Sequence, residues 1–204
     1  MLYFRGFGRQ NPPRVPQDTS TASSVEICIL AGGLSRRMGR DKSRLRLGGR
    51  TMLGQIRGTA STLGLTVRII RRDAVARCGP LGGIYTALQT TKADAVMFLA
   101  CDMPFVTAAL LRAVLERSIQ QGKALFVRSE GKPGFPFVIR RKALATVASQ
   151  IEQGKLSLHG LARKLRAKTF SLPANQQTQL RNVNTQGEWA RAVTIWDNEL
   201  KRDS

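Results

Sequence analysis

The sequence predicts an α/β protein, a single doubly wound, Rossmann-like domain with a mainly parallel sheet. Short apolar runs rich in β-branched residues recur along the chain, as in strands that are buried on both faces. Segments with helical periodicity lie between these runs, at lengths that fit strand–helix–strand units. With 204 residues and a hydrophobic fraction of 42%, the chain can bury the core that such a domain needs.

The expected elements alternate along most of the chain. We expect strands at residues 25–30, 65–70, 95–100, 124–129, 135–140 and 169–172. We expect helices at residues 51–63, 84–91, 106–122, 142–154, 156–168 and 186–202. The helix at 106–122 is the clearest, because a glycine, Gly122, ends it and five apolar residues share one face: Leu110, Leu111, Val114, Leu115 and Ile119.

The termini and the cysteines exclude several classes of protein. Residues 1–24 are rich in Pro, Gly, Ser and Thr and carry scattered arginines, so we expect a disordered basic extension before a domain at 25–204. No apolar run approaches the length of a membrane span, and the start lacks the apolar core of a signal peptide, which favours a cytoplasmic chain. Cys28, Cys78 and Cys101 form no CxxC pair, which argues against a zinc knuckle or a disulfide scaffold.

The charge is strongly positive. The chain has 33 basic and 13 acidic residues, which gives a net charge of +20. This charge indicates an anionic partner, or it is a general feature that keeps proteins of the source organism soluble. Only 6% of the residues are aromatic and most lie in apolar runs, which argues against nucleic-acid binding. The basic segments Arg140–Lys142 and Lys155–Lys168 have two interpretations, a face that receives an anionic cofactor or a merely solvated face.

A glycine-rich and basic loop, "LAGGLSRRMGRDK", follows the first expected strand at Leu30–Lys42. Gly32 and Gly33 allow the backbone to approach a ligand, and consecutive N–H groups there can bind an anion. Arg37 and Lys42 add positive charge, so the loop favours phosphate. Neither GxxxxGK[ST] nor GxGxxG is present, and a simple strand-to-helix turn with a solvated rim remains the alternative.

The order of residues in this loop is more specific than two adjacent glycines. It resembles the signature loop of the MobA-like nucleotidyltransferases, the molybdenum cofactor guanylyltransferases. The matching residues are Leu30, Ala31, Gly32 and Gly33, then Arg37, Met38 and Gly39, then Asp41 and Lys42.

A second glycine motif, "GPLGGI", precedes the helix expected at 84–91. It begins with Gly79, Pro80, Leu81 and Gly82. A rigid turn with exposed backbone groups can read a flat base through main-chain hydrogen bonds, although the first turn of a helix is the alternative. The motif resembles the family's guanine-reading segment, and Asp73 resembles an acid that the family places near the nucleotide ribose.

Asp102 follows the strongest expected strand in the motif "LACDMPF". A carboxylate at the carboxyl end of such a strand faces the ligand crevice and suits Mg²⁺, which takes few carboxylates and completes its shell with phosphate oxygens and water. The alternative is an N-cap of the next helix, for which Thr107 is the better candidate. The Mg²⁺-binding aspartate of the family stands in the same context.

The segment "RNVNT" at Arg181–Thr185 precedes the last expected helix. Asn182 and Asn184 alternate, so in an extended segment they point to the same side. The alternative is a turn with ordinary asparagines and a helix cap. The segment is similar to the family's Asn-Val-Asn-Thr sequence, which lies close to the pterin-bearing substrate.

The resemblance spans about residues 25–196 and implies an activity. It implies an Mg²⁺-dependent enzyme that transfers GMP from GTP to the terminal phosphate of molybdopterin and releases pyrophosphate. Arg37, Lys42 and Asp102 are then the catalytic residues, with Mg²⁺ at Asp102. The residues it places at the nucleotide and the substrate are Leu30, Ala31, Gly32, Gly33, Lys42, Asp73, Gly79, Pro80, Leu81, Gly82, Asp102, Asn182 and Asn184.

The resemblance also bears on partners and leaves alternatives open. It implies neither nucleic acid nor membrane as a partner, and it leaves room for a molybdoenzyme or a cofactor-biosynthesis protein. One alternative is a related transferase that uses CTP or a sugar or alcohol phosphate. Another is a non-catalytic nucleotide-binding descendant, because the stretch at 63–79 is shorter than usual in the family. Retention of Lys42 and Asp102 argues against the latter, and His159 is expected to be a surface or packing residue.

Overall fold

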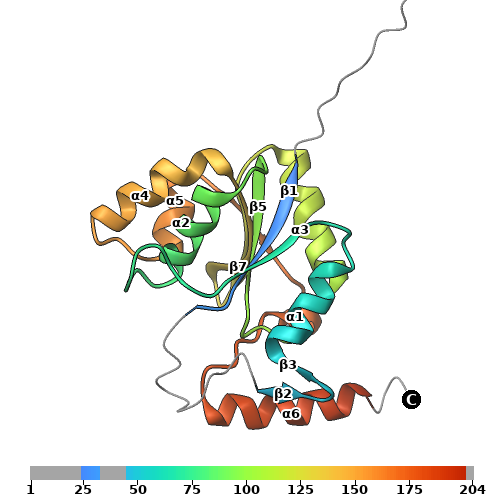
Figure 1. Ribbon diagram of the computed structural model, residues 1–204. Helices are drawn as coiled ribbons and strands as arrows, with labels where there is room; N and C mark the ends of the chain where they lie inside the picture. Colours follow the sequence, from blue (N-terminus) through green and yellow to red (C-terminus); the bar gives the residue numbers. More distant parts are fainter. Residues whose placement is uncertain (1–23, 33–44, 201–204) are drawn as a thin grey trace, which may run out of the picture.

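The computed structural model describes residues 24–32 and 45–200, and its centre is a six-stranded sheet (Figure 1). The strand order is β4-β1-β5-β7-β6-β8. The strands are β1 (Val25–Leu30), β4 (Val67–Ile70), β5 (Ala95–Ala100), β6 (Leu125–Ser129), β7 (Lys132–Arg140) and β8 (Lys168–Ser171). The predicted extension at 1–24 lies outside the described residues apart from Ser24.

Five of the six strands point the same way. β1 is parallel to β4 and β5, and β6 is parallel to β8, whereas β7 is antiparallel to both of its neighbours. The predicted mainly parallel α/β sheet is therefore confirmed. The five strands end at one edge, called the carboxyl edge below, and begin at the opposite amino edge. In sheets of this kind ligands bind beyond the carboxyl edge.

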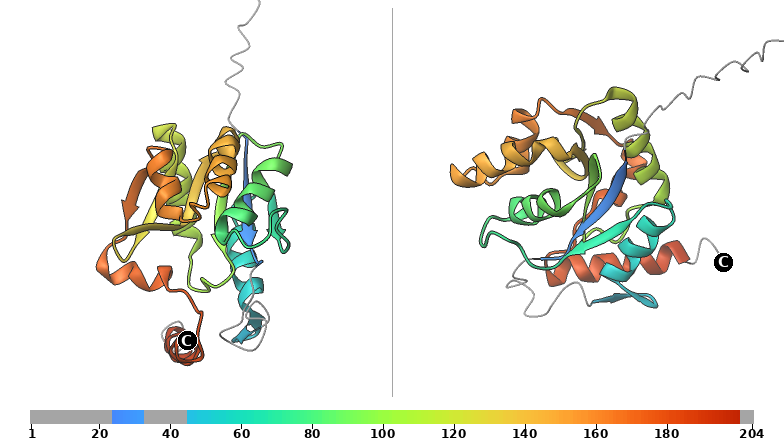
Figure 2. Two further views of the ribbon diagram at one scale, coloured as in Figure 1. Left: turned by 90° about the vertical axis from the view of Figure 1, so that its left-hand side faces the viewer. Right: turned by 45° about the horizontal axis from the view of Figure 1, so that its top comes forward.

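Helices cover both faces of the sheet (Figures 1 and 2). α1 (Met52–Ser61) and α3 (Ala108–Gln121) lie on one face, and α2 (Pro80–Thr90), α4 (Leu144–Glu152) and α5 (Leu158–Lys164) lie on the other. Successive side chains of β5 alternate between two cores, because neighbours in a strand point to opposite faces. Met97 and Leu99 pack toward α1 and α3, while Val96 and Phe98 pack toward α2.

The clearest predicted helix differs from expectation on one face. Thr107 caps α3, since its hydroxyl accepts a hydrogen bond from the Leu110 backbone N–H at 3.2 Å, and Gly122 ends the helix in the left-handed conformation. Ile119, expected in the buried stripe, is 59% exposed, and Ser118 is buried in its place. Ser118 continues the buried row of Leu111 and Val114, and Ile119, one position further on, lies about 100° around the helix from Ser118.

Several elements were not predicted from the sequence. A hairpin of β2 (Arg46–Leu47) and β3 (Arg50–Thr51) precedes α1, and 3-10 turns occupy Arg141–Ala143 and Ala174–Leu180. α2 begins at Pro80 rather than Ile84, because the "GPLGG" motif forms its first turn.

α6 (Gln186–Leu200) lies beyond the carboxyl edge, beside the β2–β3 hairpin (Figures 1 and 2). A small third core of Leu47, Phe105, Val183 and residues of α6 joins these parts. Gly48, at φ +61°, brings the hairpin so close to Trp196 that a Cβ there would lie 2.7 Å from the indole nitrogen. The hairpin and α6 therefore form one wall of the region beyond the sheet.

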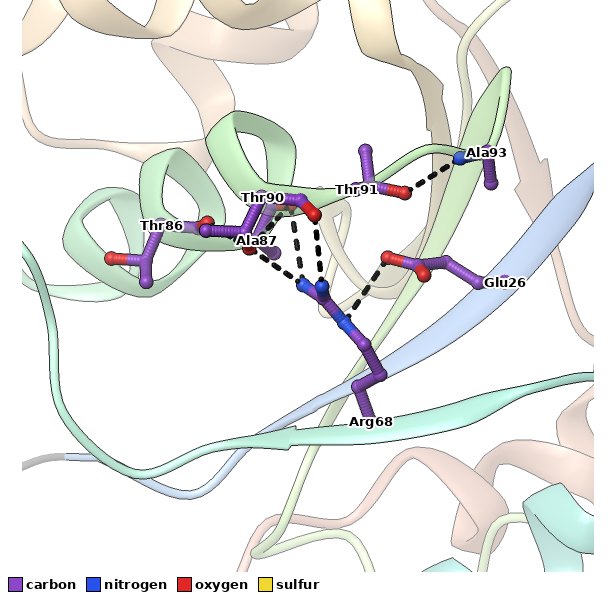
Figure 3. Close-up of polar contacts among 7 residues, drawn as sticks. All are labelled: Glu26, Arg68, Thr86, Ala87, Thr90, Thr91 and Ala93. Carbon is purple, nitrogen blue, oxygen red and sulfur yellow. Dashed lines mark hydrogen bonds and ion pairs between the residues drawn. The ribbon is translucent and has the colours of Figure 1, made fainter.

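The C-terminal end of α2 is fixed to β1 and β4 by Arg68 (Figure 3). The Arg68 guanidinium donates hydrogen bonds to the carbonyl of Ala87 and to the carbonyl and hydroxyl of Thr90, at 3.0–3.3 Å. Its Nε lies 3.4 Å from the carboxylate of Glu26, which is almost fully buried. These contacts fix the orientation of α2, and with it the position of the glycine turn at its other end.

Candidate nucleotide-binding site

The first glycine motif lies at the carboxyl edge, between β4 and β5. The Ala31 backbone N–H donates to the Ile70 carbonyl at 2.8 Å, and the Cys101 N–H donates to the Leu30 carbonyl at 3.1 Å. Gly32 is exposed and is the last residue described before position 45. Gly33, Arg37 and Lys42, which complete the predicted phosphate loop, lie outside the described residues.

Asp73 connects the two glycine motifs. A Cβ at Gly32 would lie 3.3 Å from Oδ1 of Asp73 and 3.2 Å from the Arg71 carbonyl. A Cβ at Gly82 would lie 2.8 Å from Oδ2 of Asp73, and one at Gly83 would lie 3.3 Å from Oδ1. The three glycines thus bring backbone from two motifs against one carboxylate. Burial raises the pKa of Asp73 above its ordinary value.

The segment from Asp73 to α2 is fixed by a hydroxyl. Thr86 donates to the Gly82 carbonyl at 2.8 Å, and its oxygen accepts from the Ala74 N–H at 2.8 Å. Gly79 precedes the helix at φ +55°, a conformation that glycine adopts without steric cost. Pro80 is the first helical residue and Leu81 is fully buried. The turn is therefore the start of a helix, as the alternative interpretation of "GPLGG" expected, and it lies beside Asp73. Its contact with a base stays a prediction.

Asp102 is half-buried directly beyond β5, at the same edge. Thr107 takes the cap position of α3, so the alternative interpretation of Asp102 as an N-cap is wrong. The Asp102 backbone carbonyl accepts a hydrogen bond from the Val183 N–H at 2.9 Å. This bond joins the "CDMPF" segment to the "RNVNT" segment, which are about 80 residues apart in sequence.

The two asparagines of "RNVNT" line a cavity of about 640 Å³. Val183 between them is buried and lines the same cavity. Glu188 of α6 holds the segment, since its Oε2 accepts from the N–H groups of Asn184 at 2.7 Å and Thr185 at 2.9 Å. These bonds lower the pKa of Glu188. The other lining residues include Arg181, Arg191, Gln177 and Glu130.

The donors at this edge fit magnesium. Among the residues described, no group of three His, Cys, Asp or Glu side chains gathers as a protein-only metal cage would require. Asp102 supplies a single carboxylate at the edge where phosphates are expected. One or two carboxylates are typical for Mg²⁺, whose remaining ligands are substrate phosphates and water.

Arg140–Lys142 and Lys168 lie away from this site. Arg140 pairs with Ala95 at the start of β5, which places Arg140–Lys142 at the amino edge. Lys168 pairs with Leu125 at the same edge. The interpretation of Arg140–Lys142 as a face that receives the cofactor of this site is therefore wrong. His159 is exposed on α5, as expected.

Sequence reasoning missed one residue that holds the site and one hairpin that packs against α6. Glu188 completes a capping box with Thr185, whose hydroxyl accepts from the Glu188 N–H at 3.2 Å, and the spacing Thr-x-x-Glu is a known signal for it. The β2–β3 hairpin has Gly48 and Gly49 between two short strands, which is also a recognisable turn signal.

Across the described ranges, no helix has both the length and the apolar character to span a membrane.

Known proteins resemble this chain in sequence and in fold. A probable molybdenum cofactor guanylyltransferase of Opitutus terrae is 32% identical over 189 residues, which cover 81% of this chain and 93% of the relative. A molybdenum cofactor guanylyltransferase of Shewanella frigidimarina is 28% identical over 183 residues, covering 80% and 93%. The fold matches molybdopterin-guanine dinucleotide biosynthesis protein A of Archaeoglobus fulgidus with a TM-score of 0.69 and 20% identity, covering 85% and 99%.

The family described as the MobA-like NTP transferase domain matches residues 27–169. That range contains both glycine motifs, Asp73 and Asp102, and it ends before the asparagine segment. The chain therefore belongs to the family of MobA-like NTP transferases.

Proposed function

We propose that this protein is a molybdenum cofactor guanylyltransferase, which transfers GMP from GTP to the terminal phosphate of molybdopterin and releases pyrophosphate. The names of its relatives support this proposal. The observation that carries it is the meeting of four sequence motifs at one edge of the sheet, with Asp73 against both glycine motifs and the asparagine segment bonded to Asp102.

The nucleotide would lie across the two glycine motifs. Backbone N–H groups at Gly32 and Gly33 cradle the phosphates. Arg37 and Lys42, which lie outside the described residues, neutralise the β- and γ-phosphates and the departing pyrophosphate. The turn that begins at Gly79 reads the guanine through main-chain groups, and the position of Asp73 between the motifs suits a contact with the ribose.

The acceptor would occupy the cavity beside Asn182 and Asn184. Its volume of about 640 Å³ falls within the usual range of about 300–1,000 Å³ for small-molecule sites. Arg181 and Arg191 in its lining suit a phosphate-bearing ligand. The hydrogen bond from the Val183 N–H to the Asp102 carbonyl joins the wall of this cavity to the segment that carries Asp102.

The reaction demands positioning and charge neutralisation. An oxygen of the molybdopterin phosphate attacks the α-phosphorus of GTP, a new P–O bond forms, and the bond to the β-phosphate oxygen breaks. The attacking phosphate is already anionic, so no general base is needed. Asp102 would hold Mg²⁺, which when bound neutralises charge on phosphate oxygens. The chain itself brings two mutually repelling anions together and orients them.

The test is calorimetric titration with GTP, CTP, ATP and UTP, each with and without Mg²⁺. We expect Mg²⁺-dependent binding that is selective for GTP. Asp102→Asn should remove the Mg²⁺ dependence while the fold remains, because the bond from Val183 uses the backbone carbonyl of Asp102. Asp197→Asn, which removes an exposed carboxylate of α6, is the control for the change in charge.

Turnover tests the roles of the charged residues. Lys42→Ala should reduce turnover by about 10²-fold or more, the usual loss when a contact to charge in the transition state is removed. Preference for CTP would instead indicate a related transferase. Absence of binding to any nucleotide would indicate a non-catalytic descendant and would contradict the proposal.

A further inference from the structure

Two hollows adjoin at the amino edge of the sheet, opposite the nucleotide site. One has a volume of about 810 Å³ and lies between the ends of α2 and β7 and the start of α4. The other, of about 490 Å³, lies between the segment after α3, the end of β7 and the end of α5. Both are lined by Gly122, Arg140 and Lys142. Strands of six residues separate the two edges by roughly 20 Å.

The smaller hollow combines positive charge with an apolar floor. Lys123, Arg140, Lys142 and Arg166 line it, together with apolar residues that include Ile139. No carboxylate lines it. In the described part of the chain, no hydrogen bond or ion pair engages the charged groups of Lys123, Lys142 or Arg166. Asp94 lines the larger hollow, where its carboxylate accepts from the Ser24 N–H and hydroxyl.

Arg166 occupies a backbone position at the end of α5 that glycine usually takes. Arg166 has φ +48°, in the left-handed region that glycine favours at the end of a helix. Its N–H donates to the Arg163 carbonyl at 3.0 Å and the next N–H donates to the Ala162 carbonyl at 2.9 Å, which is the hydrogen-bond pattern of such a cap. An arginine there costs stability that a glycine would not.

We propose that the smaller hollow is a second anion site, separate from the nucleotide site, that binds an organic phosphate. The phosphate lies among Lys123, Lys142 and Arg166, and the apolar part of the ligand lies on the floor formed by Ile139 and its neighbours. A hollow of about 490 Å³ has the size of a small-molecule site, which favours a small ligand over an extended polymer. The site goes beyond the proposed transfer reaction and does not depend on it.

The experiment is an NMR titration of the full chain at 0.15 M salt, where long-range effects of the net charge are screened beyond about 8 Å. The probes are inorganic phosphate and 1-naphthyl phosphate. Backbone amides of residues 122–124, 140–143 and 165–166 report the amino edge, and those of residues 31–32, 79 and 81–83 report the nucleotide site. We expect 1-naphthyl phosphate to shift the amino-edge amides and to bind about tenfold more tightly than phosphate, the effect of burying roughly 60 Å² of apolar surface.

Arg166→Gly separates binding from folding. It removes the cation and also the backbone strain, so Tm should rise by about 2 °C while the affinity at the amino edge falls about tenfold. Arg163→Gln, an exposed cation of α5 that lines neither hollow, should leave both affinities unchanged. Shifts confined to the nucleotide site would overturn the proposal. So would an unchanged amino-edge affinity in Arg166→Gly, or amino-edge shifts with a short RNA but not with 1-naphthyl phosphate.

Discussion

Replacement of Gly82 by alanine should disrupt the contact between the two glycine motifs. The new Cβ would lie 2.8 Å from both Oδ2 of Asp73 and the carbonyl of Val75. The Val75 oxygen belongs to the backbone, so the segment from 73 to 75 must shift. Overpacking of this kind costs about 1–3 kcal/mol, and the clash with two groups places it at the upper end. Alanine in a helix regains at most about 1 kcal/mol relative to glycine. The net loss of stability is therefore about 1–2 kcal/mol.

The assay combines thermal unfolding with GTP titration. For a chain of this size the loss should lower Tm by about 3–6 °C. The affinity for GTP should fall by about tenfold or more, because the displaced segment carries Asp73. Gly58→Ala in α1 is the matched control, since its Cβ would meet only the flexible end of Arg50 at 3.0 Å. That variant should gain about 0.5–1 kcal/mol and bind GTP normally.

Normal stability and normal GTP binding in Gly82→Ala would refute the predicted clash. If Gly82→Ala were as stable as the parent protein and bound GTP equally well, the close approach of α2 to Asp73 would have no consequence. The assignment of this turn to the nucleotide site would then be wrong. Loss of stability in both glycine variants would show instead that the effect is general to helical glycines and not specific to the contact.

Three further predictions concern single residues. Glu188→Gln should destabilise the protein by about 1 kcal/mol at neutral pH, because its carboxylate accepts from two backbone N–H groups. The folded-state pKa of Glu188 is lowered, so this stabilisation is present above the unfolded pKa of about 4.5 and is lost as pH falls through the folded pKa. Denaturant titrations from pH 7 to pH 3 should show the two proteins converging, and a constant difference would contradict the assignment. Glu130→Asn should raise Tm by about 1–2 °C, since φ is +50° there and asparagine adopts this conformation more readily, whereas a lower Tm would count against it. Cys28 is fully buried, which raises its pKa to about 12, so it should react with a thiol reagent only as fast as the protein unfolds. Rapid labelling of Cys28 in the native protein would contradict this.

The sequence was most informative where one signal decided the outcome. Val25–Leu30 and Ala95–Ala100 are strands at the predicted bounds, because continuous apolar runs suit strands buried on both faces. The order of strands in the sheet could not be predicted, since it depends on pairings distant in sequence. The antiparallel direction of β7 follows from the two-residue turn at Glu130 and Gly131, both with positive φ. Glycine in that turn is a local signal, but glutamate beside it is unusual.

Some residues of the candidate site could be placed from the sequence and others could not, because contacts between segments distant in sequence leave no local signal. Asp102 directly follows a predicted strand, so the pattern placed it at the carboxyl edge, whereas Asn184 is placed there by the hydrogen bond from Val183 to Asp102. Asp73 was assigned to the site only by its resemblance to an acid of the family, yet it is the residue against which both glycine motifs pack. Its role depends on the three-dimensional approach of α2 to β1, which no spacing encodes. Conversely, Arg140–Lys142 could be assigned to an edge only once β7 was known to be antiparallel.

The most direct test of the proposed function is the fate of the labelled phosphates of GTP. The purified protein would be incubated with molybdopterin, Mg²⁺ and GTP labelled at either the α- or the γ-phosphate. We expect the α-label to be transferred to the pterin product and the γ-label to leave in pyrophosphate. Transfer from CTP in preference to GTP, or release of the γ-label as orthophosphate with no labelled pterin, would contradict it.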